Sequence, residues 1–500
     1  MVDLLRRNLV LSTLGLAACG GGAGGLGMAG NEPPASAGSN PIVEENAIAG
    51  TAADADWRIA PANVAANDEI MGYASAASVN VGGQLDLFVS TQDASYQIEV
   101  FRIGWYGGRG ARLLLTTPVL PGVVQPAPTT DPNFNMVECQ WGSSYTLQVP
   151  ASGWLSGVYL ARLVGASGKQ AYIHFVVRDD ARASAALFVC SVSTYQAYND
   201  WGGYSFYAPD QQAHNARKVS FDRPYSRMSG AGDFLVWEIN LLRFLEREGF
   251  DVSYSTDVDL HLAPGLMTVH KATLFSGHSE YWSRDLRVGV QAARDQGVHL
   301  GFFAADTCYW QVRYEDGASG AAARRVVCYK YNFKEDPLYA SDPSLTTCLW
   351  RQAPLDWPEA SLVGVMYDFN SLSADMVIDH ADNWICAGAG VAQGTVLTGL
   401  LGYEVDRLDA SSPSNVLVIA ASPYYRCSQD VCAEDTPAAA SQAAISSATF
   451  YTAPSGGGVF ATGSMQWTWG LDSFGADFHP DRVNAAAQQI TRNVLNHFVA

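Results

Sequence analysis

Titratable side chains follow three predicted strands at the point where each strand ends. His278 and Glu280 lie two residues apart in Gly-His-Ser-Glu-Tyr-Trp-Ser (277–283), directly after an apolar run. Asp306 follows a second apolar run, and Tyr198 follows a third. Because the carboxyl ends of parallel strands meet at one edge of a sheet, these groups should converge in one cleft. Carboxylate and phenolate oxygens make a hard, anionic site suited to a ferric ion, which would lower the tyrosine pKa below its usual value of about 10.

The His-x-Glu pair also has a simpler interpretation. Ser283 is a typical N-cap for a helix predicted over 283–296, so an isolated His278 or Glu280 could serve only to support that helix. The neighbouring strand ends, 195–199 and 305–310, favour a functional site because they bring further polar groups to the same edge.

The strands that end at these residues belong to a predicted α/β domain over 181–500. Residues 185–192 are a continuous apolar run, as expected of a strand buried on both faces of a parallel sheet, and further strands are predicted over 251–254, 272–276 and 298–304. Apolar periodicity predicts a helix over 233–248 in addition to the one over 283–296. Alternating strands and helices predict a doubly wound sheet.

Residues 56–180 have a different pattern, in which short β-rich runs alternate with turn residues and no amphipathic helix intervenes. This spacing predicts an antiparallel, immunoglobulin-like β-sandwich. The expected fold class is therefore all-β followed by α/β.

The first 55 residues predict an export signal and a tether. Arg6 and Arg7 precede an apolar stretch that ends in Leu-Ala-Ala-Cys19, so residues 1–19 resemble a bacterial lipoprotein signal with a lipid on Cys19. Residues 20–55 are rich in Gly, Ala, Ser and Pro, which is typical of a flexible tether. We expect a lipid-anchored protein at the periplasmic face of a bacterial membrane; a frayed hydrophobic N-terminus is the alternative.

Composition restricts the partners. The 500 residues are 48% hydrophobic and 16% charged, which excludes disorder of the whole chain. The net charge of −19 repels polyanions, so nucleic acid is not an expected partner. No uncharged apolar run spans a bilayer, which leaves the lipid as the expected membrane contact.

Eight cysteines remain besides Cys19. They are Cys139, Cys190, Cys308, Cys328, Cys348, Cys386, Cys427 and Cys432. An even number in an oxidising compartment favours disulfides, with Cys427–Cys432 as the pair that spacing suggests and Cys308–Cys328 as another candidate. No Cys-x-x-Cys doublet occurs, so a structural zinc site is not expected.

Several motifs resemble the large subunit of bacterial N,N-dimethylformamidase and the wider family that shares its C-terminal domain. They are Ala-Tyr-Asn-Asp-Trp-Gly-Gly (197–203), the 277–283 loop, the strand and loop ending at Asp306, Gly-Tyr-Glu-Val-Asp-Arg (402–407) and segments within 453–472. The resemblance spans about Trp57 to the C-terminus. It implies hydrolysis of a small amide, a glutamine-amidotransferase-like α/β domain and a possible small subunit that this chain does not encode.

In that family two tyrosines and a glutamate hold a mononuclear Fe³⁺. The resemblance implies Glu280 and Tyr198 as ligands, with His278 beside them. It places the second phenolate on Tyr159 of the sandwich, which would put the metal between the domains. Asp306 stands where the family pattern has asparagine.

The implied mechanism uses the ferric ion as a Lewis acid that polarises the amide carbonyl and activates water. His278 could accept the water proton or orient the attack, and Glu404 or Asp306 could donate to the leaving amine.

Two other functions fit the sequence. Cys308 and His278 could form a thiol hydrolase, although export argues against a free thiolate. Thirteen tryptophans and 23 tyrosines would also suit a surface protein that binds glycan or peptide and has a decayed metal site.

Overall fold

The computed structural model describes residues 40–210, 214–427, 441–476 and 479–500. The predicted signal over 1–19 with its Cys19, and Cys432 of the suggested Cys427–Cys432 pair, lie outside the described residues, so this pair stays a prediction. Among the described helices, none combines the length and the apolar character needed to cross a bilayer.

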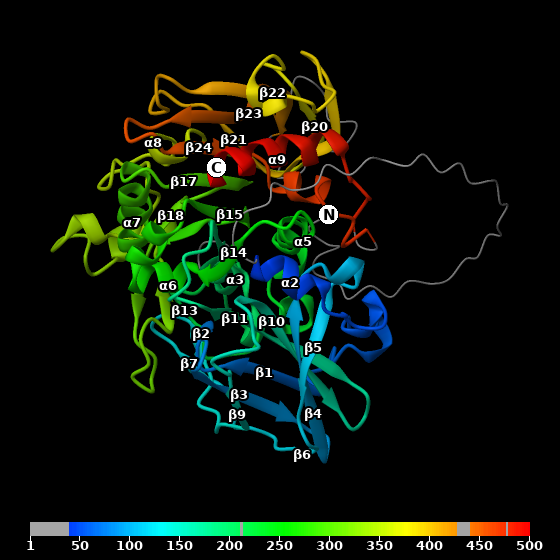
Figure 1. The fold of residues 1–500 in the computed structure, drawn as a ribbon. Helices are drawn as coiled ribbons and strands as arrows, with labels where there is room; N and C mark the ends of the chain where they lie inside the picture. Colours follow the sequence, from blue (N-terminus) through cyan, green and yellow to red (C-terminus); the bar gives the residue numbers. More distant parts are fainter. Residues whose placement is uncertain (1–39, 211–213, 428–440, 477–478) are drawn as a thin grey trace.

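The N-terminal part contains two sheets that share one apolar core (Figure 1). The first has the order β1 (Ile70–Ala74), β3 (Gln84–Thr91), β9 (Tyr145–Gln148). The second has the order β2 (Ser78–Asn80), β11 (Gln170–Arg178), β10 (Gly157–Gly165), β4 (Ser95–Ile103), β5 (Ala111–Thr116), and β6 (Leu120–Pro121) also pairs with β4. Leu85, Leu87 and Val89 alternate inward along β3, as a half-buried strand requires. All of these pairings are antiparallel except that of β2 with β11. The two-sheet part follows the prediction, and its immunoglobulin-like topology stays a prediction.

The C-terminal part is built on a seven-stranded sheet. Its order is β14 (Val252–Thr256), β12 (Ala186–Cys190), β15 (Ala272–His278), β17 (His299–Ala305), β24 (Gly458–Ala461), β23 (Ser441–Thr452), β22 (Leu417–Cys427). The first five strands are parallel, whereas the pairings of β23 with β24 and β22 are antiparallel, so the sheet is mixed.

Helices cover both faces of this sheet, as a doubly wound arrangement requires. α5 (Ile239–Arg247) and α9 (Ala485–Val499) pack on the face that carries Phe188, while α6 (Asp257–Leu262) and α7 (Arg284–Asp295) pack on the face that carries Val189 (Figure 1). The predicted helix over 233–248 is divided into α4 (Phe234–Trp237) and α5. The resemblance to a glutamine amidotransferase remains a prediction.

Smaller elements complete the described structure. They are α2 (Pro41–Ala47), α3 (Val192–Tyr198), α8 (Ala360–Val363), the pair β7 (Thr129–Asp131) and β8 (Met136–Glu138), the pair β20 (Met366–Val377) and β21 (Val396–Arg407), and the sheet β13 (Lys218–Ser220), β19 (Arg325–Val327), β18 (Trp310–Glu315), β16 (Tyr281–Ser283).

The end of the predicted tether is ordered. Residues 41–47 form α2, which begins with Asn40 as N-cap and Pro41 in the first turn. Ile42 is fully buried, and Glu45 binds Arg112 at 2.7 Å. Helix α2 therefore belongs to the folded body and not to a flexible linker.

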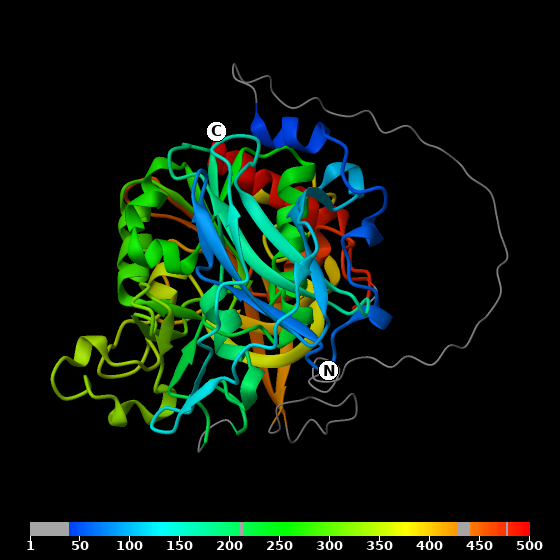
Figure 2. The ribbon, with the colours of Figure 1, turned by 90° about the horizontal axis from the view of Figure 1, so that it is seen from below.

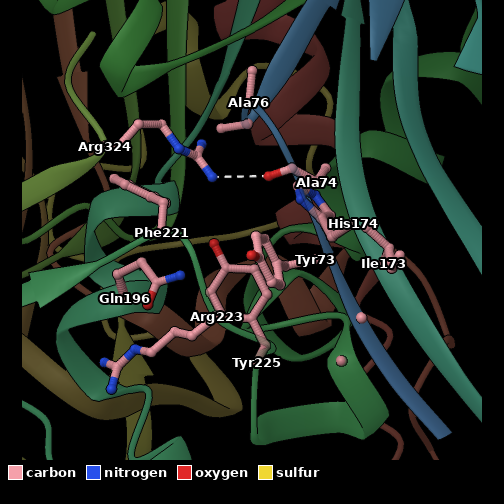
Figure 3. A pocket seen from close by; sticks show the side chains of 13 residues that line it. Tyr73, Ala74, Ala76, Ile173, His174, Gln196, Phe221, Arg223, Tyr225 and Arg324 are labelled. Carbon is pink, nitrogen blue, oxygen red and sulfur yellow. Dashed lines mark hydrogen bonds between the residues drawn. The ribbon is translucent and has the colours of Figure 1, made fainter. Parts of the chain in front are cut away.

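The two parts meet along a polar seam, which Figure 2 views from the sandwich side. Arg102 of β4 and Glu246 of α5 form a fully buried ion pair at 2.7 Å. A cavity of about 20 Å³ also lies at the seam, lined by residues that include Tyr73, His174 and Arg324 (Figure 3). A space of this size holds about one water molecule, so it is too small for an amide substrate.

Candidate functional site

The strand ends position the acidic and imidazole side chains as the sequence predicts. His278 is the last residue of β15, and Gly277 before it has φ +64°. A Cβ at Gly277 would lie 2.4 Å from Cβ of Trp237, so the turn requires glycine. Glu280 follows in the loop toward β16, and Ser283 caps α7 by accepting the N–H of Leu286 at 3.1 Å. The capping role and the candidate site thus coexist in one loop.

Asp306 follows β17 in a left-handed conformation, with φ +51°. Its backbone N–H donates to Oδ1 of Asp406 on β21 at 2.8 Å. Glu404, two residues before Asp406, extends from the same strand toward His278. Strand β21, which pairs with β20, therefore supplies the carboxylate of Glu404 and also holds the turn that carries Asp306.

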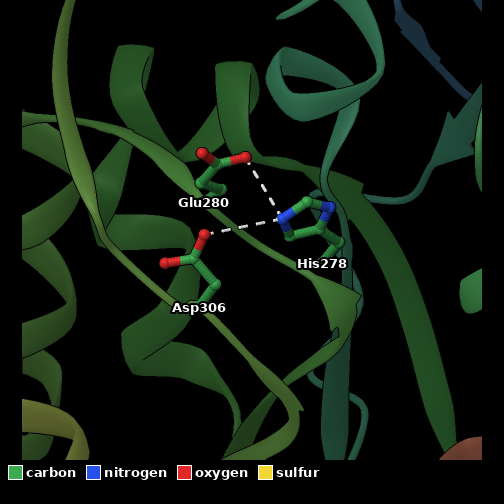
Figure 4. A group of neighbouring side chains, drawn as sticks. All are labelled: His278, Glu280 and Asp306. Atoms are coloured by element: carbon green, nitrogen blue, oxygen red, sulfur yellow. Dashed lines mark ion pairs between the residues drawn. The ribbon is translucent and has the colours of Figure 1, made fainter. Parts of the chain in front are cut away.

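His278 lies among three carboxylates, and two of them, those of Glu280 and Asp306, are drawn in Figure 4. Its Nε2 is 3.0 Å from Oε2 of Glu404, 3.1 Å from Oε2 of Glu280 and 3.7 Å from Oδ2 of Asp306. Burial alone would lower the pKa of His278, but these carboxylates, Glu404 foremost, hold it well above its usual value. The pKa of Asp306 is also well above its usual value, because the carboxyl is buried beside Glu404 and Glu280. The cluster thus favours an imidazolium and a neutral Asp306.

Two phenols converge on the other side of Glu280. Tyr198, at the end of α3, donates to Oε2 of Glu280 at 2.8 Å, and Tyr207 donates to Oε1 at 2.8 Å. The two hydroxyl oxygens are 3.0 Å apart, and the rings stack with centroids 4.4 Å apart. Burial and the Glu280 carboxylate raise the pKa values of both phenols well above 10. Both tyrosines are therefore neutral unless a cation lies between their hydroxyl oxygens and the carboxylate of Glu280.

Tyr159, the predicted second phenolate, does not join this cluster. It lies in the sandwich core on β10, where it is fully buried and stacks on Trp154 and Phe175. Its hydroxyl donates to the carbonyl of Leu155 at 2.7 Å. The aromatic packing of the sandwich accounts for this tyrosine, and the second phenol beside Glu280 is Tyr207 instead.

The sequence interpretation missed Tyr207 and Lys330. Tyr207 lies nine residues beyond Tyr198 outside any strand or helix, and no spacing rule connects it with Glu280. Lys330 places its Nζ 3.2 Å from the ring centroid of Tyr207 and is 3% exposed. Burial lowers its pKa to about 8, against the opposing effect of Glu280. A buried lysine is detectable only once the fold is known.

The cysteines do not behave as predicted. The six that the structure describes are free thiols, Cys308 and Cys328 among them, so the suggested disulfide between those two is absent. Cys308 is fully buried, and burial raises its pKa to about 12. A nucleophilic thiolate needs a lowered pKa and access, so Cys308 does not fit the thiol hydrolase.

The oxygen cluster fits a small, highly charged cation. An octahedral cation with oxygen ligands at about 2.0–2.1 Å holds neighbouring ligands about 2.8–3.0 Å apart. The hydroxyls of Tyr198 and Tyr207 and the carboxylate of Glu280 already have separations of 2.8–3.0 Å. One atom each of His278, Glu280 and Asp306 also lie within 4.8 Å of one another, but an imidazolium cannot act as a ligand. The phenol and carboxylate set is therefore the better donor set.

Known proteins are similar in sequence to this chain over most of its length. The family described as N,N-dimethylformamidase beta subunit-like, C-terminal, matches residues 97–483. The N,N-dimethylformamidase beta subunit of Paracoccus aminophilus is 23% identical over 72% of this chain and 55% of its own. That of Alcaligenes sp is 24% identical over 64% of this chain and 43% of its own. The chain thus spans about half the length of these curated relatives.

One solved structure can be compared with this chain. A Paenibacillus sp. cycloisomaltooligosaccharide glucanotransferase aligns over 51% of this chain and 33% of its own with 11% identity and a TM-score of 0.15, which carries no argument. The match over residues 97–483 covers more than half of the sequence. It includes the two phenols of the candidate site as well as His278 and the carboxylates around it. The chain belongs to the N,N-dimethylformamidase beta subunit-like, C-terminal family.

Proposed function

We propose that this protein is an iron-dependent amidohydrolase that cleaves the C–N bond of a small amide. The observation that carries the proposal is the cluster of two phenol oxygens and one carboxylate, with separations of 2.8–3.0 Å. The names of the relatives support amide hydrolysis, and their designation as beta subunits supports a separate small subunit as a partner.

The residues that would hold the ion are Tyr198, Tyr207 and Glu280. A ferric ion there would supply Lewis-acid chemistry, polarising the amide carbonyl and lowering the pKa of water. Lys330 lies over the face of Tyr207, where its ammonium group would stabilise negative charge on that phenol.

His278, Asp306 and Glu404 supply the proton transfers. Because the pKa of His278 is held high, its imidazolium orients Glu404, and Glu404 acts as the base that takes the water proton. The neutral carboxyl of Asp306 gives its proton to the leaving amine. Nε2 of His278 lies 3.7 Å from Asp306 and 3.0 Å from Glu404, so the imidazolium can give its proton to the ionised Asp306 and then take the proton held by Glu404, which restores all three groups.

The test is metal analysis combined with a single substitution. Protein from iron-replete cells should contain about one iron per chain and show a phenolate-to-iron charge-transfer colour. Glu280→Ala should lose iron and colour while its circular dichroism stays that of the wild type, because Glu280 touches both phenols. A screen of formamides and acetamides should give hydrolysis only with the iron-loaded protein. A colourless, iron-free wild type with unchanged amides would refute the proposal.

We propose in addition that the protein is exported and anchored by a lipid at Cys19. The support is the sequence of residues 1–19. Full-length protein should partition into detergent, whereas Cys19→Ala should remain in the aqueous phase; equal partitioning would exclude the anchor.

A further inference from the structure

Arg223 is a buried guanidinium bonded to backbone carbonyls. It is 1% exposed, and burial lowers its pKa to about 10. Its Nη1 donates to the carbonyls of Trp201 at 3.0 Å and Tyr204 at 2.8 Å, and its Nη2 donates to that of Asn199 at 2.7 Å. A buried charge is costly unless its hydrogen bonds are made, and these three bonds to carbonyls offset that cost for the two terminal nitrogens.

The three carbonyls belong to one short segment, residues 199–204. That segment leads from Tyr198 to Tyr207, the two phenols of the candidate site. The planar fork of Arg223 therefore fixes three points on the chain that joins two candidate iron ligands.

The start of this segment is fixed a second time by the side chain of Asn199. Its Nδ2 donates to Oε1 of Gln196 at 3.0 Å and to the carbonyl of Pro224 at 2.9 Å. Its Oδ1 accepts the N–H groups of Trp201 at 3.2 Å and Ser226 at 3.0 Å. All the hydrogen-bonding capacity of the side-chain amide is used, so this side chain is held in place and does not point to the phenols of the candidate site.

Residues of the N-terminal part that lie outside its two main sheets contact the same segment. Gly202 has φ +79°, and a Cβ there would lie 2.6 Å from Cγ1 of Val137 on β8. Trp201 makes an edge contact with Trp141, with centroids 6.2 Å apart. The N-terminal part thus contacts residues 199–204 through Val137 of β8 and through Trp141, while Tyr159 stays in the core of the sandwich.

We propose that Arg223 is a positioning residue that sets the distance between the hydroxyls of Tyr198 and Tyr207. The consequence for metal binding rests on the proposed function, because only a bound ion uses both oxygens as ligands. If the guanidinium is replaced by an ammonium group, the charge is kept but three carbonyls can no longer be fixed in one plane.

The experiment compares Arg223→Lys with a matched control, Arg287→Lys. Arg287 is also fully buried and also binds backbone carbonyls, those of Trp357 at 2.7 Å and Pro358 at 2.8 Å. Three properties are measured: iron affinity, the wavelength of the charge-transfer band, and amide hydrogen exchange of residues 199–207 in metal-free protein.

Arg223→Lys should weaken iron binding by about 10- to 100-fold, shift the band and speed exchange over 199–207. Arg287→Lys should leave all three as in the wild type, even if it lowers thermal stability. If the two variants have the same band, affinity and exchange, the inference is wrong.

Failure of the proposed function gives a different pattern. If the wild type binds no iron, the amidohydrolase proposal falls, and exchange over 199–207 alone decides the role of Arg223. If Arg223→Lys does not fold, Gly202→Ala tests the same segment through the 2.6 Å contact with Val137. Iron affinity should fall in Gly202→Ala and recover in part in Gly202→Ala/Val137→Ala; unchanged affinity in the single variant overturns the inference.

Discussion

Tyr207 and Tyr159 are both largely enclosed by protein, but their hydroxyl groups have different partners. The hydroxyl of Tyr207 donates to Glu280 and lies 3.0 Å from that of Tyr198, whereas the hydroxyl of Tyr159 donates only to a backbone carbonyl. The acceptor of the hydroxyl group therefore distinguishes Tyr207, a candidate metal ligand, from Tyr159, a residue of the sandwich core.

We predict that Tyr207→Phe lowers iron affinity at least 10-fold and weakens the charge-transfer band, because one phenol oxygen is removed. Tyr159→Phe should keep full iron content and lose roughly 0.5–1.5 kcal/mol of unfolding free energy, the typical contribution of one hydrogen bond. Iron analysis, visible spectra and denaturant unfolding of both variants measure these effects. Loss of iron in Tyr159→Phe alone would restore the sequence-based assignment.

At the scale of elements, the turn after β17 depends on the neighbouring strand β21. Asp306 adopts φ +51°, and its N–H has the carboxylate of Asp406 as acceptor at 2.8 Å. Burial raises the pKa of Asp406 to about 7. What the turn requires from Asp406 is an oxygen that accepts the N–H of Asp306. The side-chain amide oxygen of an asparagine can accept the same hydrogen bond.

We predict that Asp406→Asn keeps most activity, whereas Asp406→Ala lowers kcat and destabilises the fold by about 1–3 kcal/mol. The alanine variant leaves a buried N–H unpaired and releases the turn that carries Asp306. Amide-hydrolysis kinetics and unfolding by denaturant test both variants. Equal kcat for the two would show that the turn does not need this acceptor.

At the scale of the whole molecule, the seam between the two parts contains a buried histidine. His174 on β11 is 5% exposed and lies between the rings of Tyr195 and Phe234, with centroids 5.6 and 5.4 Å away. Burial lowers its pKa from 6.5 to about 3. His174 is therefore neutral in the folded protein across the range in which the unfolded chain becomes protonated.

The sign of the pH effect follows from proton uptake. Between pH 6.5 and 3 the unfolded state binds one more proton at His174 than the folded state, so unfolding free energy falls as pH falls, by up to roughly 1.4 kcal/mol per pH unit. His174→Phe should remove this slope, and the exposed control His380→Ala should keep it. Denaturant unfolding between pH 7 and 4 measures the difference; identical slopes in wild type and His174→Phe would contradict the prediction.

The sequence by itself identified features that depend on short stretches of chain. Apolar runs followed by polar residues predicted the strand ends at His278 and Asp306, and Ser283 was recognised as the cap of α7. Short β-rich runs alternating with turn residues in 56–180 predicted the paired sheets. These features are local, because strand burial and helix capping are set by residues within a few positions of each other.

Tertiary structure decided everything that joins distant segments. Glu280 is 73 residues from Tyr207 and 82 from Tyr198, and no periodicity relates such positions. The motif that contains Tyr198 was visible, but only the folded loop around Arg223 brings Tyr207 to the same carboxylate. The predictions for Tyr159 and for a Cys308–Cys328 disulfide were wrong for the same reason: an isolated side chain has the same chemistry in a core and in a site, and its neighbours in space determine which role it takes.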